Sequence, residues 1–176
     1  EGKGLLVSAL RDVDTSGNVV GMRFRRGAGG SQPYANAVLL ENCRANGNSN
    51  WALDYGEGSG LYIRTCDFES NGTVGDVNTG GVIIRDTVDD ETGFALIDID
   101  GLWLESNKGH SFRMLPSANS MLKMKSVQVY VQESTRAITI GAIRSATFEN
   151  ILAPSGSAEL VCEAELQNYL GNVNVF

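Results

Sequence analysis

The sequence predicts an all-β solenoid, because one short alternating pattern returns several times along the chain. Residues 60–72 read GLYIRTCDFESNG, residues 96–107 read LIDIDGLWLESN, and residues 37–48 repeat the pattern more faintly. Apolar residues occupy every second position of each strand in a copy, which is typical of a β-strand with one buried face. Repeats of this length indicate stacked units that share one core.

The two clearest copies can be paired position by position. Both end in Glu-Ser-Asn, and each reads as two short strands separated by a two-residue corner. Their shared apolar positions are Leu61/Ile97, Ile63/Ile99, Cys66/Leu102 and Phe68/Leu104.

A third apolar stretch lies between successive copies, so we expect about six coils of three short strands. Loops rich in Gly, Asn and Asp, such as residues 72–80, explain why the spacing between copies varies. The first coil is expected to begin near Leu5, the last near Ile143, and a partial coil to follow at residues 166–176. Residues 158–170 fit either a helix or a strand followed by a cap. The third stretches are Met22–Phe24, Trp51–Tyr55, Val82–Ile84, Phe112–Met114, Ile138–Ile140 and Leu160–Cys162.

Composition suits this fold and limits the function. Of 176 residues, 42% are apolar and 21 are Gly, so we expect one domain over residues 1–176 with a continuous core. The chain begins at Glu1 without an initiator Met, and we expect it to be a piece of a longer protein. Its net charge of −7 argues against nucleic acid as a partner, and no apolar run is long enough for membrane insertion.

The cysteines are expected to be core residues. Cys43 and Cys66 occupy equivalent inward positions, so they should stack as two buried thiols rather than form a disulfide. No CxxC motif is present and the chain has a single His, so we expect no metal and no cofactor.

The residues between the apolar positions should point outward and stack from copy to copy. Three acidic residues of one copy (Asp98, Asp100, Glu105) and its Trp103 then lie beside residues of the neighbouring copies. The expected columns are Tyr62–Asp98–Lys123, Arg64–Asp100–Lys125, Asp67–Trp103–Gln128 and Glu69–Glu105–Tyr130.

These columns predict a glycan groove. Tyr62, Arg64, Asp67, Trp103 and Tyr130 would bind the sugar, because aromatic rings offer flat apolar platforms and polar side chains meet hydroxyl groups. Glycosidic cleavage needs two carboxyl groups, one as acid and one as base or nucleophile. The candidates for that catalytic pair are Asp98, Asp100, Glu105 and Glu69.

Structural roles for the same residues remain open. Opposite charges in the Arg64 column would stabilise any solvated sheet, and a loop or a neighbouring subunit could cover Trp103. Asn48, Asn71 and Asn107 occupy comparable turn positions, where a ladder of asparagines that caps backbone groups is favoured over ligand binding. Asn71 also begins an Asn-Gly-Thr sequon, which matters only in a secretory setting.

The repeats resemble a known superfamily. The segments GLYIRTCDFESNG and GLWLESNKG, the Asn-Gly turns and the GGVIIRD strand over residues 37–150 are similar to the right-handed, single-stranded parallel β-helix of pectate-lyase-like proteins. The nearest group is the phage tailspikes and capsule depolymerases. Their resemblance implies a homotrimer at the virion tail or outside the cell that binds, and often cuts, a bacterial polysaccharide.

The resemblance leaves the chemistry open. Neither the pectate lyase nor the polygalacturonase signature is present, and the acidic doublet Asp89-Asp90 lies in a turn, so no catalytic residue is carried over. Two interpretations remain: a glycoside hydrolase or polysaccharide lyase fragment, or a non-catalytic shaft, adhesin or receptor-binding segment.

Overall fold

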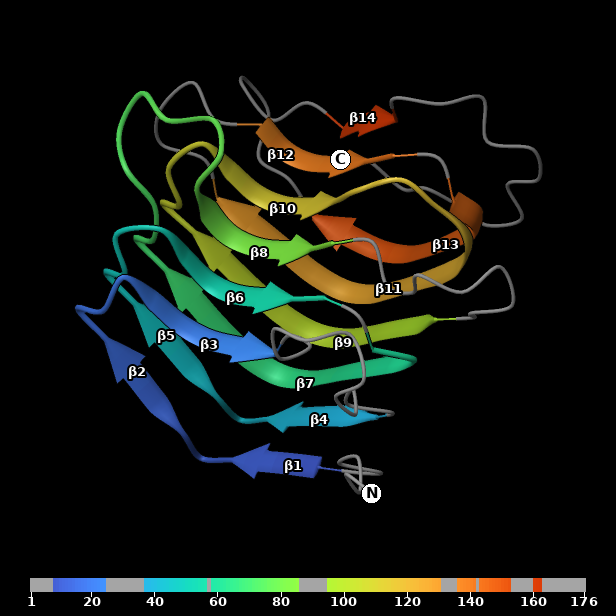
Figure 1. Cartoon of the computed structure of the whole chain (residues 1–176), viewed down its shortest axis with the longest axis horizontal. Coiled ribbons are helices and arrows are strands. Elements are labelled where there is room, and N and C mark those ends of the chain that lie inside the picture. The colour runs from blue at the N-terminus through green and yellow to red at the C-terminus, as the bar shows by residue number, and fades with distance from the viewer. Residues whose placement is uncertain are drawn as a thin grey trace, which may run out of the picture.

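Two parallel β-sheets make up the described part of the protein. A computed structural model describes residues 8–24, 37–56, 58–85, 95–130, 136–141, 143–152 and 160–162. Every strand pair recorded in both sheets is parallel, and the chain crosses from one sheet to the other and back along its length (Figure 1). The predicted all-β class is confirmed. None of the described residues is helical, so they provide no helix that could cross a membrane.

The first sheet contains the strands of the repeated pattern. Its hydrogen-bonded order is β1-β4-β7-β9-β11-β13, with β2 paired to β5 and β5 to β7. Its strands are β1 (Ser8–Arg11), β2 (Asp14–Ser16), β4 (Val38–Glu41), β5 (Arg44–Asn46), β7 (Gly60–Glu69), β9 (Leu96–Glu105), β11 (Ser117–Tyr130) and β13 (Ile143–Leu152).

The second sheet contains the third apolar stretches, whose positions are confirmed. Its order is β3-β6-β8-β10-β12-β14. The strand β14 fits the strand alternative that was predicted for residues 158–170. Three other expectations lie outside the described residues: the rest of 158–170, the start near Leu5 and the partial coil at 166–176. The strands are β3 (Val20–Phe24), β6 (Trp51–Tyr55), β8 (Gly80–Ile84), β10 (His110–Met114), β12 (Arg136–Ile140) and β14 (Leu160–Cys162).

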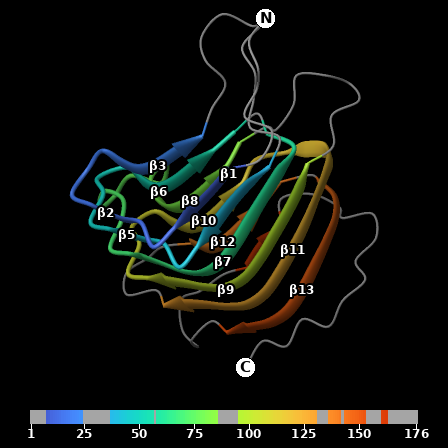
Figure 2. The same ribbon diagram turned by 90° about the horizontal axis from the view of Figure 1, so that it is seen from below.

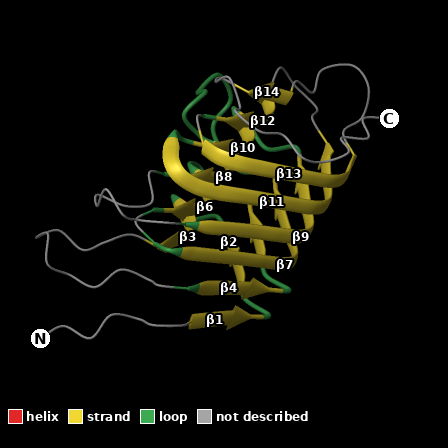
Figure 3. Cartoon of the chain, turned by 90° about the vertical axis from the view of Figure 1, so that its right-hand side faces the viewer, coloured by secondary structure: helices red, strands yellow, loops and turns green. Residues whose placement is uncertain are grey.

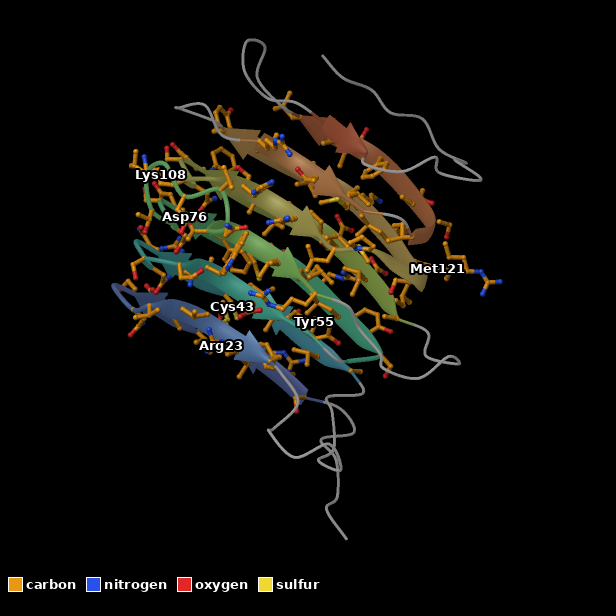
Figure 4. All side chains as sticks on the ribbon, turned by 45° about the horizontal axis from the view of Figure 1, so that its top comes forward. Arg23, Cys43, Tyr55, Asp76, Lys108 and Met121 are labelled. Atoms are coloured by element: carbon orange, nitrogen blue, oxygen red, sulfur yellow. The ribbon has the colours of Figure 1, made fainter. Side chains whose placement is uncertain are left out.

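The core lies between the sheets and is built from the inward positions of the repeats. Leu61, Ile63, Cys66 and Phe68 are all buried, as are the matching residues of β9. The neighbouring registers Glu41–Arg64 and Arg44–Asp67 place Cys43 opposite Cys66, and both thiols are free. Cys43 is labelled in Figure 4. Its backbone N–H donates to Cys66 Sγ at 3.4 Å, which confirms the stacked thiols.

The predicted two-residue corner between two short strands is present between β1 and β2 and between β4 and β5, but the later strands differ from the prediction. One residue with positive φ turns the strand, while hydrogen bonds such as Asn42 N to Arg64 O (2.9 Å) continue on either side of it. In β7, β9, β11 and β13 the two short strands are therefore one long bent strand (Figures 2 and 3). Residues in this conformation at the bend are Asp12, Asn42, Thr65, Gly101, Ser126 and Asn150, with φ between 52° and 74°. We call this set the corner ladder.

The expected asparagine ladder is present where the long strands end. Asn71 Nδ2 donates to Asn107 Oδ1 at 3.0 Å, and Asn48 Nδ2 donates to Asn71 Oδ1 at 2.8 Å. The backbone N–H of Asn18 donates to Asn48 Oδ1 at 3.0 Å, so Asn18 is a further member that the repeat pattern did not reveal. The ladder satisfies backbone groups that the turn leaves without strand partners, as buried polar groups require.

Candidate functional site

The predicted outward columns are confirmed by the strand registers. Asp67 pairs with Trp103 and Glu69 with Glu105, and the following strand adds Gln128 and Tyr130 to these columns. The columns on the other side of the corner are Tyr62–Asp98–Lys123 and Arg64–Asp100–Lys125. The corner ladder divides the nine predicted site residues into two groups.

The group before the corner forms a face on which charges are paired. Arg64 Nη2 lies 3.2 Å from Asp98 Oδ2, and Arg64 Nη1 donates to the backbone O of Asp98 at 2.8 Å. The guanidinium carbon of Arg64 lies 5.9 Å from the centroid of the Tyr62 ring, and Lys125 Nζ lies 3.7 Å from Glu149 Oε1. We call this surface the paired face; it also carries Asp100 and Lys123.

The group after the corner borders a groove. The groove has a volume of about 490 Å³ and follows the corner ladder across several neighbouring strands. We call its wall the groove face. Its residues are Asn42, Arg44, Thr65, Cys66, Asp67, Glu69, Gly101, Leu102, Trp103, Glu105, Ser126 and Gln128.

An aromatic pair stands at the groove. The rings of Trp103 and Tyr130 are stacked, with centroids 5.1 Å apart and planes 24° from parallel. The indole N–H of Trp103 donates to Glu105 Oε2 at 2.9 Å, which fixes the orientation of the ring. Tyr130 is among the exposed large apolar residues, at 36% of its accessible surface. The stack therefore presents a rigid flat surface next to carboxylates.

Asp67 is a partly buried carboxyl group of the groove. Its Oδ1 atom is buried and has no hydrogen-bond partner in the described structure. Burial raises the pKa of the Asp67 carboxyl; the positive charge of Arg44 lowers it, and the negative charge of Glu105 raises it again. A carboxyl group that holds its proton more tightly than usual is suited to donate that proton in catalysis.

The structure brings together five of the nine residues predicted from the sequence. Asp67, Glu69, Trp103 and Glu105 line the groove and Tyr130 stacks beside it, whereas the other four belong to the paired face. Sequence reasoning missed Arg44, although the fainter copy at residues 37–48 placed it one unit before Asp67. Within the described residues, no group of three or more His, Cys, Asp or Glu side chains is arranged to hold a metal ion.

Asn71 lies outside the groove face and its side chain is committed to the fold. The residue is fully buried, and Nδ2 donates to the backbone O atoms of Ala45 (2.8 Å) and Glu69 (2.9 Å). In the folded chain the amide nitrogen of this sequon is inaccessible, so the ladder role is the one the geometry supports.

Comparisons with known proteins leave the site to be interpreted from its own chemistry. Models of protein families, curated proteins and solved structures give no match to this chain.

Proposed function

We propose that this chain binds a bacterial surface polysaccharide along the groove face. The observation that carries the proposal is the Trp103–Tyr130 stack beside a groove lined with carboxyl groups. A sugar ring offers an apolar face that packs on an aromatic platform, and hydroxyl groups that donate to carboxylates. A linear glycan also needs a site long enough to contact several of its sugar units, and the groove follows the corner ladder across neighbouring strands.

The proposal includes the finer architecture. Two parallel sheets joined by repeated crossings fit a right-handed single-stranded β-helix of about six coils, like that of the pectate-lyase-like proteins. The parent protein would then be of the phage tailspike type, a homotrimer of the virion tail or another extracellular protein. The support is the repeat pattern, the regular stacking register and the asparagine ladder.

Cleavage of the bound glycan is a second candidate function, favoured by Asp67. In this scheme the protonated carboxyl of Asp67 donates its proton to the glycosidic oxygen as the bond to the sugar carbon breaks. The carboxylate of Glu69 or Glu105 then acts as base toward water or as nucleophile. Asp98 is engaged with Arg64 on the other side of the corner, which makes it a weaker candidate for this chemistry.

A binding assay tests the first proposal. Tryptophan fluorescence reports on the groove, because Trp103 borders it while Trp51, the other tryptophan, is buried. We expect a panel of capsule and lipopolysaccharide glycans to contain a ligand, and Trp103→Ala to weaken its binding about tenfold or more when measured by calorimetry. Tyr62→Ala, on the paired face, should bind as wild type does. The groove is the wrong site if Tyr62→Ala weakens binding and Trp103→Ala does not.

A second assay separates cleavage from binding. New reducing ends, or absorbance of the unsaturated sugars that a lyase releases, would identify an enzyme, and Asp67→Asn should abolish the hydrolytic product. Binding without any product would instead support a non-catalytic shaft, adhesin or receptor-binding segment.

A further inference from the structure

The charge of the groove face points to one chemical class of glycan. This inference rests on the proposed function, since it concerns what the groove selects. Three carboxyl groups line the groove, Asp67, Glu69 and Glu105, against one guanidinium, Arg44. Even when Asp67 holds its proton, Glu69 and Glu105 outnumber Arg44, so the groove has an excess of negative groups within a concave wall, where charges are screened less than on an open surface.

The two glutamates have no cationic partner in the described structure. Glu69 and Glu105 are direct neighbours in the register of β7 and β9, and no salt bridge of either is found among the described residues. Like charges directly opposite each other on neighbouring strands destabilise a sheet. A positive group placed between the two carboxylates would relieve this repulsion.

The paired face shows that the chain neutralises such charges elsewhere. Asp98 is paired with Arg64, and Glu149 with Lys125. These side chains come from β7, β9, β11 and β13, and the first three of these bent strands also line the groove face. On the groove face, the residues that follow Glu105 and Trp103 in register are Tyr130 and Gln128, which carry no positive charge. Glu69 and Glu105, neighbours in register without a cationic partner among the described residues, thus lie on the surface that the ligand would occupy.

We infer that the groove binds a polysaccharide that contains hexosamine units with free, protonated amino groups. Such a ring stacks on Trp103 through its carbon-bound hydrogens, while its ammonium group donates charge-assisted hydrogen bonds to Glu69 and Glu105. These bonds are shorter and stronger than those between neutral partners. Uronate or sulfated polysaccharides would face repulsion from the same carboxylates.

Three oligosaccharides of matched length separate the classes, and the first two share one linkage. The probes are chitosan oligomers (free amines), their N-acetylated counterparts (neutral) and oligogalacturonate (anionic), titrated by tryptophan fluorescence at low salt. We expect the amine form to bind about tenfold more tightly than the neutral form, and the anionic form to bind most weakly. The preference should shrink as salt is added, because the pairs are partly exposed.

Charge-removing variants locate the preference. Glu69→Gln should abolish the advantage of the amine form while keeping binding of the neutral form, since Trp103 is unchanged. Glu149→Gln removes the same charge from the paired face and should keep the full preference. Equal binding of the amine and neutral forms, or tighter binding of oligogalacturonate, would overturn this inference and leave the proposed function standing. Failure of all three oligomers and of the glycan panel to bind would overturn both.

Discussion

The paired face and the groove face are built from the same bent strands, yet they carry opposite kinds of surface. Before the corner ladder, Arg64 and Lys125 neutralise nearby carboxylates at 3.2 and 3.7 Å. After it, Asp67 has a buried oxygen without a partner, and Glu69 stands beside Glu105. One face therefore resembles an ordinary solvated sheet, while the other retains unsatisfied polar groups in a concave wall, as ligand sites do.

A single backbone feature separates the two faces. Each corner residue has positive φ, so the chain turns within one residue while the strand pairing continues on both sides. Trp103 and Asp98 are both outward residues of β9, but Gly101 lies between them and only Trp103 lines the groove. The same alternation of side chains thus supplies two different surfaces.

The largest expected effect on stability comes from the asparagine ladder, in which Asn71 hydrogen-bonds the backbone of the groove-face residue Glu69. Asn71→Ala removes donors to Ala45, Glu69 and Asn107 and leaves several buried groups unsatisfied, each at about 1–3 kcal/mol. We expect the free energy of unfolding to fall by about 3 kcal/mol, as measured by urea denaturation.

Asn18→Ala is the matched control for the ladder. Asn18 is exposed at its end, and its side chain donates to Ser16 O at 3.2 Å, so the loss should stay below about 1 kcal/mol. Equal losses of unfolding free energy in the two variants would mean that the burial of the ladder is not what stabilises the fold.

Substitutions in the corner ladder should have the next largest effect, a change of about 1 kcal/mol in the free energy of unfolding. Gly101→Thr places a β-branched residue at φ 74°, a conformation that costs such residues about 1–2 kcal/mol. Thr65→Asn replaces a β-branched residue that already lies at φ 52°. It should stabilise the chain by about 0.5–1 kcal/mol, because Asn tolerates the left-handed region. Thermal unfolding of both variants measures the difference. A stabilised Gly101→Thr variant would refute this explanation of the corner.

A pair of arginine variants compares the faces directly. Arg64→Gln breaks the ion pair with Asp98, and because Arg64 is partly exposed we expect a loss of about 0.5 kcal/mol that diminishes at high salt. Arg44→Gln, on the groove face, should cost less stability but raise the pKa of the Asp67 carboxyl further, since Arg44 lowers it in the wild type. Urea denaturation and carboxyl NMR titration measure these two effects. A larger stability loss for Arg44→Gln would reverse the contrast between the faces.

The smallest expected effect is a pH dependence that arises at Asp67 of the groove face. Burial raises the pKa of Asp67 above its ordinary 3.8, so the folded chain binds this proton more tightly than the unfolded chain does. The stability contributed by the protonated carboxyl is full below pH 3.8 and is lost as the pH rises through the raised pKa. The Asp67→Asn variant should therefore gain stability relative to wild type over that interval, as seen in melting temperatures across pH. Parallel pH curves for the two proteins would contradict the assignment.

The columns could be predicted from the sequence because register in a sheet is tightly specified. A slip of one residue would expose Leu61, Ile63 and the other inward residues, so alternation alone fixed which side chains point outward. The corner that divides the two faces was predicted as well, but the pairing of charges on only one of them was not, because it depends on side-chain contacts such as that of Arg64 with Asp98, its diagonal neighbour rather than its register partner. Asn18 escaped notice because the first unit departs most from the repeat.

The burial of Asn71 sets a condition on how the protein can be made. In a compartment that glycosylates sequons, a glycan attached to the nascent chain would occupy the nitrogen that must later donate to Ala45 and Glu69. Folding and modification of this residue are thus mutually exclusive outcomes, decided by which occurs first. A host without that machinery avoids the competition, and in any other host the order of events determines the yield of folded protein.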